Sequence, residues 1–188
     1  MIGNDIVDLA EAKQKSNWQR PRFLEKLFTI REQQLIKNSE HSFFMVWRLW
    51  SMKEAAYKLY TQIHQSRFYN PKGFECNIKN ETGIVRFKDF ECNVKTQMTS
   101  KYVLSEARLT SSKITSRVIA LKVNYPKNQS EVTKSALLSE LSKQYKVSKA
   151  DLEFQKTEFG IPTVFINSEK IQVSLSHHGC FGAYVIGL

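Results

Sequence analysis

The 188-residue sequence has no run of about 18 apolar residues, the length that a membrane-spanning helix requires. Its first residues, Met-Ile-Gly-Asn-Asp, place no basic segment before an apolar one, so we expect no signal peptide. Three cysteines, Cys76, Cys92 and Cys180, suit neither a disulfide framework nor a C-x-x-C zinc site. These absences predict a cytoplasmic protein with reduced thiols and no membrane partner.

Short signatures of several common functions are missing as well. Neither the G-x-x-x-x-G-K-[ST] nor the G-x-G-x-x-G phosphate-binding loop occurs, and there is no Ser–His nucleophile elbow. Aromatic side chains, in contrast, are plentiful: 12 Phe, 7 Tyr and 3 Trp in a chain that is 41% hydrophobic exclude disorder. The length suits one compact domain, or two small halves that share a core.

Positive charge is unevenly distributed along the chain. The net charge is +10, and residues 131–188 contribute none of it because their lysines balance their acids. A basic surface attracts nucleic acids, acidic lipids, phosphorylated cofactors or an acidic protein, and an ordinary solubilising surface is equally compatible. No helix-turn-helix, zinc-finger or RNP signature accompanies the charge, so we expect no nucleic-acid partner.

The hydrophobic pattern predicts an α+β fold in two halves, 1–125 and 126–188, divided at a polar segment that contains a proline. The first half has a buried strand at 2–9, helical segments over 17–39 and a central helix at 42–63 with apolar steps of three and four. Short strands are then expected at 74–78, 84–87, 92–98, 102–107 and 117–123. In the second half a helix that starts at Ser130 precedes strands at 152–156, 162–166, 171–176 and 183–186.

Three polar groups interrupt these apolar elements. Asp5 stands in a hydrophobic strand, where an acid is costly unless it is paired or binds a cation. Glu54 and Lys58 are four residues apart on the central helix and project from the same side, away from its buried stripe. Ser176 and His177 end a strand, and both can donate hydrogen bonds to a phosphate. Taken singly, each group also fits an ordinary role as a turn acid, a surface ion pair or a surface histidine.

Taken together, the three groups resemble the motifs of the 4'-phosphopantetheinyl transferase superfamily. Residues 3–7 (G-N-D-I-V) resemble its G-x-D-I-V/E motif, residues 50–58 (W-S-M-K-E-A-A-Y-K) its W-x-x-K-E-A-x-x-K motif, and residues 173–177 (V-S-L-S-H) its S-[IL]-S-H motif. The first and third motifs are weak signals alone. The second is fairly specific, and the combination of all three in one short chain is a strong signal.

The order of the motifs carries further information. The surfactin-synthetase-activating type is built as two similar halves, and its S-x-S-H strand precedes the other motifs. Residues 131–187 resemble its opening stretch and residues 1–125 the part that follows, so the chain is similar to a circular permutation. The resemblance implies two helix-plus-antiparallel-sheet halves packed as a pseudo-dimer. The shorter holo-acyl-carrier-protein synthases also place S-x-S-H last but act as trimers; with both halves in one chain, we expect a monomer.

The resemblance implies an enzyme that moves the 4'-phosphopantetheine arm of coenzyme A to a serine of an apo acyl or peptidyl carrier protein. Adenosine 3',5'-bisphosphate is the other product, and fatty acid, polyketide or peptide pathways use such carriers. Asp5 and Glu54 would hold Mg²⁺, with Glu54 as general base and Lys58 at the phosphates. The carriers are acidic, which would give the positive charge a partner. The implied coenzyme A contacts are Lys53, Lys58, Ser176 and His177.

Two positions depart from the pattern of the family. The second acid of the two-half enzymes, two residues after Asp5, is Val7 here, and Asp8 has the wrong strand parity to replace it. The G-K-P segment near the nucleotide is Gly-Ile-Pro at 160–162, so one lysine is lost. These departures leave a second hypothesis open, a non-catalytic relative that binds a carrier protein or coenzyme A.

Overall fold

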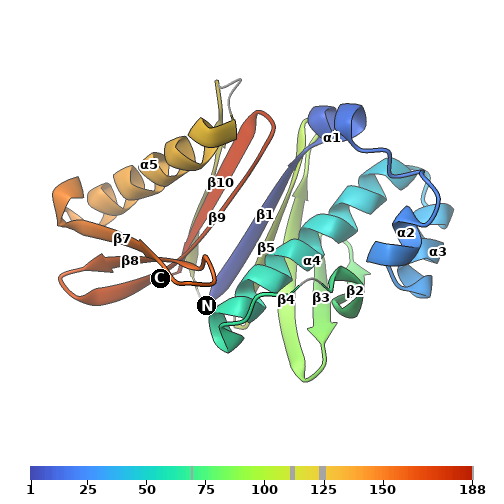
Figure 1. Ribbon diagram of the computed structural model, residues 1–188, viewed down its shortest axis with the longest axis horizontal. Helices are drawn as coiled ribbons and strands as arrows, with labels where there is room; N and C mark the ends of the chain where they lie inside the picture. The colour runs from blue at the N-terminus through green and yellow to red at the C-terminus, as the bar shows by residue number, and fades with distance from the viewer. Residues whose placement is uncertain (69, 111–112, 123–125, 188) are drawn as a thin grey trace.

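Two antiparallel five-stranded sheets form the framework of the computed structural model, which describes residues 1–188 except 69, 111–112, 123–125 and 188 (Figure 1). The strand order is β1-β5-β4-β3-β2 in the first sheet and β6-β10-β9-β8-β7 in the second. The first sheet contains β1 (Ile2–Asp8), β2 (Glu75–Lys79), β3 (Thr82–Phe87), β4 (Phe90–Met98) and β5 (Tyr102–Arg108). The second contains β6 (Ile114–Ala120), β7 (Leu152–Lys156), β8 (Pro162–Ile166), β9 (Glu169–His178) and β10 (Phe181–Gly187).

One long helix packs on each sheet, and shorter helices extend the first half. The helices are α1 (Leu9–Lys15), α2 (Phe23–Leu27), α3 (Ile30–Asn38), α4 (Ser42–His64) and α5 (Pro126–Tyr145), and 3₁₀ turns lie at Pro71–Gly73 and Lys149–Asp151. Thr29 and Glu32 form a capping box at the start of α3, which satisfies two backbone N–H groups. Within the described parts of the chain, no helix combines the length and hydropathy needed to cross a membrane.

The two halves share one topology. Each consists of a strand, a long helix and a four-stranded meander whose last strand pairs with the first strand of the half: β5 with β1, and β10 with β6. The halves meet where β1 lies along β9 and β10, so that strands from the two ends of the chain are neighbours (Figure 1). The expectation of an α+β fold with two similar halves is therefore confirmed.

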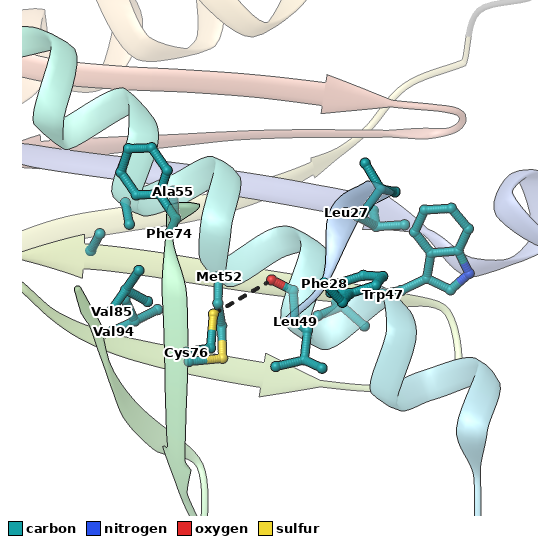
Figure 2. Packing of buried hydrophobic residues seen from close by; sticks show 14 of the residues in the cluster. Leu27, Phe28, Trp47, Leu49, Met52, Ala55, Phe74, Cys76, Val85 and Val94 are labelled. Atoms are coloured by element: carbon teal, nitrogen blue, oxygen red, sulfur yellow. Dashed lines mark hydrogen bonds between the residues drawn. The ribbon is translucent and has the colours of Figure 1, made fainter. Parts of the chain in front are cut away.

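Helix α4 lies on the first sheet through the apolar stripe that its sequence predicts. Leu49, Met52 and Leu59 are fully buried, whereas Ile63 at the end of the stripe is 37% exposed. Leu49 and Met52 belong to one core cluster with Val85 and Val94 of the sheet, and Figure 2 shows these side chains together. Burial of each large apolar side chain contributes about 1.5–3 kcal/mol, so the stripe fixes the rotation of α4 about its axis.

Gly3 lets β1 approach α4 unusually closely. A Cβ atom at this position would lie 2.1 Å from the backbone oxygen of Ala55, a separation that no side chain tolerates. The glycine of the first motif is thus required by packing, because only glycine allows this approach of strand to helix. Asp5, two residues later, is brought to the surface of α4 as a result.

The sequence misplaces one strand and one helix start. The strand expected at 117–123 was grouped with the first half, but β6 occupies Ile114–Ala120 and pairs with β10 in the second sheet. The change of sheet therefore falls between β5 and β6, before the division expected at residue 125; residues 123–125 lie outside the described part. Alternating hydrophobicity predicts a strand but not its partner. Helix α5 starts at Pro126 rather than Ser130, because proline suits the first helical turn.

Candidate active site

Asp5 of β1 and Lys58 of α4 form an ion pair at the junction of strand and helix. The Lys58 Nζ lies 3.0 Å from the Asp5 Oδ1 and also donates to the backbone oxygen of Asn4 at 2.9 Å. The Ser51 hydroxyl, two turns earlier on α4, donates to the backbone oxygen of Asp5 at 3.0 Å. Two turns of α4 are thereby attached to the same segment of β1, which holds the carboxylate and the ammonium group in place.

Glu54 lies between these two attachment points on α4 and carries a perturbed carboxyl group. The pKa of Glu54 is raised to about 7, first by burial and then by the negative charge of Asp5, while the positive charge of Lys58 opposes the shift. Burial also raises the pKa of Asp5, although the charge and hydrogen bond of Lys58 lower it. Two acids and one lysine therefore share a partly buried site. A carboxyl group that titrates near neutral pH is suited to act as a general base.

His177 extends the site into the second half of the chain. Its ring borders a hollow of about 420 Å³ between α5 and the second sheet. Burial lowers the pKa of His177, and the charges of Lys58 and Lys156 lower it further. Lys58 of α4 is paired with Asp5 of β1, and β1 lies along β9, so α4 and β9 both pack against β1. The other side chains around the hollow include Lys134, Phe154, Lys156, Pro162 and Leu175.

Ser176, predicted to bind coenzyme A, lies at the seam between the halves. It is only 6% exposed, and its hydroxyl oxygen accepts a hydrogen bond from the Asn4 side-chain amide at 3.0 Å. The Ser174 hydroxyl oxygen accepts from the Asn4 backbone N–H at the same distance. The two serines of the third motif thus bind Asn4 of the first motif. Nothing in the sequence links these distant residues, which is why Asn4 was missed.

Lys53, also predicted to bind coenzyme A, is buried in an ion pair. Its Nζ lies 2.8 Å from a carboxylate oxygen of Glu32 on α3, donates to the backbone oxygen of Phe74 and lies over the Phe28 ring. Both side chains of the ion pair are 1% exposed, and the second oxygen of Glu32 accepts from the Cys76 N–H. Two oxygen atoms of the protein thus accept from the Lys53 ammonium group. The structure gives Lys53 a role in anchoring α4, and its contact with coenzyme A stays a prediction.

A second hollow, of about 580 Å³, opens beside Glu54. Four of the residues that line it are aromatic, and it is also lined by two basic residues, Lys53 of α4 and Arg67 of the loop that follows α4. Trp50 and Tyr57 belong to the motif at residues 50–58, whereas Arg67 and Phe68 lie outside the three motifs and were not identified from the sequence. The side chains around it include Trp50, Tyr57, Arg67, Phe68, Pro71 and Phe74.

Known proteins place the chain in a family. Residues 1–117, more than half of the chain, match the model of the 4'-phosphopantetheinyl transferase superfamily. The chain belongs to this superfamily. Among solved structures it is similar to Helicobacter pylori holo-[acyl-carrier-protein] synthase in complex with coenzyme A, at 15% identity and a TM-score of 0.25, over 99% of this chain and 97% of that chain. No curated protein sequence matches.

The donor set of this phosphopantetheinyl transferase family member fits a hard divalent cation. Across the residues that the structure describes, no group of three or more His, Cys, Asp and Glu side chains forms a complete metal cage. Asp5 and Glu54 nevertheless supply two carboxylates whose like charges disfavour each other, since Asp5 raises the pKa of Glu54. Mg²⁺ binds in proteins through one or two carboxylates, with substrate phosphates and water completing the shell. These two residues are therefore suited to hold Mg²⁺ together with a phosphorylated substrate.

The second acid of the two-half enzymes, which is Val7 in this chain, is not replaced by the neighbouring Asp8. Val7 is 3% exposed and packs in the first core cluster, so its position holds an apolar side chain without space for a charge. Asp8 caps α1, with its Oδ1 accepting from the N–H groups of Ala10 and Glu11. Its Oδ2 accepts from the Cys180 N–H at 2.8 Å. Both carboxylate oxygens of Asp8 thus accept hydrogen bonds from backbone N–H groups outside the candidate site.

Proposed function

We propose that this superfamily member transfers 4'-phosphopantetheine from coenzyme A to a serine of an acidic apo carrier protein, acyl or peptidyl, with Mg²⁺. The observation that supports it most directly is the site formed by Asp5, Glu54 and Lys58, in which Glu54 titrates near neutral pH and lies beside an ion pair. The charge of Lys58 also reaches His177 at the other half. We further propose a cytoplasmic monomer, because both halves of the site come from one chain.

Each residue has a defined part in the proposed reaction. Glu54, directly or through a water, takes the proton from the serine hydroxyl of the carrier as its oxygen attacks the phosphorus of the pantetheine phosphate. The bond from that phosphorus to the bridging oxygen breaks, and adenosine 3',5'-bisphosphate leaves with the bonding electrons. Lys58 stabilises negative charge on the pyrophosphate, and His177 with Lys156 holds the nucleotide end. Mg²⁺ held by Asp5 and Glu54 would add positive charge at the pyrophosphate.

The reaction is tested by incubating purified protein with Mg²⁺, coenzyme A and a panel of apo carrier proteins. Mass spectrometry is expected to show one added phosphopantetheine on at least one carrier, on its conserved acceptor serine. Glu54→Gln is expected to reduce the rate at least about 100-fold because the base is lost. Glu25→Gln, at an exposed position of α2, serves as the matched control and is expected to retain the rate. A panel left unmodified by the wild-type protein refutes transfer.

A non-catalytic relative is the second candidate, motivated by Val7 and Ile161. It shares the expected binding of coenzyme A or carrier protein but leaves the carrier mass unchanged. Calorimetry with coenzyme A and with each carrier, run beside the mass measurement, separates the two candidates. Binding without modification favours the relative, whereas binding followed by modification favours the enzyme.

A further inference from the structure

We propose that Gln129 is a positioning residue that fixes which ring nitrogen of His177 carries the proton. Gln129 lies near the start of α5, and its side-chain oxygen is 3.2 Å from the Nδ1 of His177. Its side-chain nitrogen donates to the backbone oxygen of Gly179 at 2.8 Å. One amide group thus spans the end of β9 and contacts both His177 and the turn that follows it.

The chemistry of the two partners fixes the orientation of the Gln129 amide. A backbone carbonyl only accepts hydrogen bonds, so the NH₂ group must face Gly179 and the oxygen must face His177. An amide oxygen also only accepts, so the Nδ1 of His177 must carry a hydrogen. In the neutral ring this leaves Nε2 without a hydrogen, as the nitrogen that remains for a ligand in the neighbouring hollow.

The turn that holds Gln129 is itself firmly placed. The Cys180 N–H donates to the Asp8 Oδ2 at 2.8 Å, which attaches the turn to the first half. Gly179 has a φ of +56°, and a Cβ atom there would lie 2.3 Å from the Asp8 Oδ2, so only glycine fits. The Gly179 carbonyl is therefore a fixed acceptor. If the Gln129 amide flipped, this hydrogen bond would be lost and the side-chain oxygen of Gln129 would face the Gly179 carbonyl oxygen.

The adjacent histidine has the opposite arrangement. The Nδ1 of His178 accepts a hydrogen bond from the Asp8 backbone N–H at 3.0 Å, so a neutral His178 carries its hydrogen on Nε2. Two neighbouring rings are thus held in different tautomers by different partners. His178 provides an internal reference for any measurement on His177.

The tautomer decides what His177 recognises. With Nε2 free of hydrogen, the neutral ring repels phosphate oxygens; only the protonated ring donates from Nε2 while still donating from Nδ1 to Gln129. Burial favours the neutral ring of His177, and so do the basic groups Lys58 from α4, Lys156 from β7 and His178 on its own strand. Glu131 and Lys134 of α5, which have opposite charges, border the same hollow. The ring is therefore expected to stay neutral until an anion binds. Under the proposed function, binding of a nucleotide phosphate therefore takes up a proton at His177.

The tautomer is tested first, because this test requires no ligand. Long-range ¹H–¹⁵N NMR of the full-length protein at about pH 8, above the ordinary histidine pKa, identifies the protonated nitrogen of each ring. We expect hydrogen on Nδ1 of His177 in the wild type and in Gln129→Glu, which keeps the accepting oxygen, and on Nε2 in Gln129→Leu. Gln129→Glu is also expected to raise the pKa of His177, because it adds a negative partner. The His178 signals should stay unchanged and report an intact turn.

Hydrogen on Nε2 of His177 in the wild type overturns the proposal. So does an unchanged tautomer in Gln129→Leu while His178 is undisturbed. If the His178 signal is disturbed in Gln129→Leu, the wild type and Gln129→Glu decide. In these two proteins, hydrogen on Nδ1 of His177 supports the proposal and hydrogen on Nε2 overturns it.

The consequence for binding is tested by calorimetry with coenzyme A and 3'-dephospho-coenzyme A in buffers of different ionisation enthalpy. We expect net proton uptake with coenzyme A near neutral pH, less uptake with the dephospho compound, and less in Gln129→Leu, whose neutral ring already donates from Nε2. Equal uptake in wild type and Gln129→Leu contradicts the coupling. Absence of coenzyme A binding with an Nδ1 tautomer contradicts the proposed function but leaves the role of Gln129 standing.

Discussion

Glu54 combines burial with a neighbouring acid, and the two effects give a testable dependence of stability on pH. Its folded pKa of about 7 lies above the ordinary glutamate value of 4.5, so between these pH values the folded state holds a proton that the unfolded state releases. Stability therefore falls as pH rises from about 5 to 7 without metal. Glu54→Gln removes this loss of stability. In urea unfolding with EDTA we expect the variant to have a higher free energy of unfolding than the wild type, by on the order of 1–2 kcal/mol at pH 8 and by much less at pH 5.

Two further measurements sharpen the Glu54 prediction. Mg²⁺ is expected to stabilise the wild type at pH 8 by favouring the ionised carboxylate, and to have little effect on Glu54→Gln. Glu25→Gln, at an exposed position, is expected to change stability equally at both pH values. An equal gain for Glu54→Gln at pH 5 and pH 8 contradicts a raised pKa.

Asp5 is expected to govern metal dependence more than folding. Asp5→Ala removes one of two carboxylates suited to Mg²⁺ and frees Lys58 from its ion pair. We expect the Mg²⁺ concentration for half-maximal transfer to rise about 10- to 100-fold, with a lower maximal rate. The measurement is the rate of carrier modification across a Mg²⁺ titration, with Asp89→Ala at an exposed turn as control. An unchanged Mg²⁺ requirement rules out Asp5 as a metal ligand.

At the scale of single residues, sequence spacing predicted which way a side chain projects from its element, but not which groups surround that side chain. The four-residue interval placed Glu54 and Lys58 on one side of α4, and the structure brings both beside Asp5. The resemblance to the family motif implied a coenzyme A contact for Lys53, and its ion pair was not foreseen, because its partner Glu32 lies 21 positions earlier on another helix and no local pattern links the two. The same holds for Ser176, whose partner Asn4 is at the other end of the chain. The roles of the site residues stay predictions.

At the scale of elements, the Lys53–Glu32 pair anchors α4 to α3 below the site. Lys53→Met leaves a buried carboxylate without its cation and is expected to lower the free energy of unfolding by about 3–5 kcal/mol. Adding Glu32→Gln is expected to restore part of this loss, because the charge disappears while an oxygen remains for the Cys76 N–H. Urea unfolding of both variants measures the effect, and Lys37→Met, exposed on α3, is the control. A double variant no more stable than Lys53→Met contradicts a charge-based explanation.

The elements themselves were largely predictable, but their partners were not. The apolar stripe of α4 predicted the helix and its buried face, since periodicity is a local property. The pairing of β6 with β10 depends on contacts between segments more than 60 residues apart, and its alternation is weak because its residues are exposed or half-buried. Sheet membership is a tertiary property, so the strand was assigned to the wrong half.

At the scale of the whole molecule, repeated topology explains how distant motifs form one site. The halves meet at β1, which carries Asp5, and at β9, which carries His177 near its end. Asn4 crosses this seam with hydrogen bonds to Ser174 and Ser176. Asn4 directly precedes Asp5, and Ser176 directly precedes His177, so the hydrogen bond between Asn4 and Ser176 lies next to a site residue on each strand. The seam thus sets the relative position of the two parts of the site.

The distribution of charge over the halves gives a prediction for the carrier partner. The whole +10 belongs to residues 1–130, so an acidic carrier is expected to approach the first half. Raising ionic strength from about 0.05 M to about 0.3 M is expected to increase the KM for carrier several-fold with little change in kcat, because screening weakens encounter. Lys13→Gln with Lys101→Gln is expected to reduce this salt dependence, whereas the matched pair Lys146→Gln with Lys149→Gln in the second half is expected to leave it unchanged. Equal effects of the two pairs contradict docking on the first half.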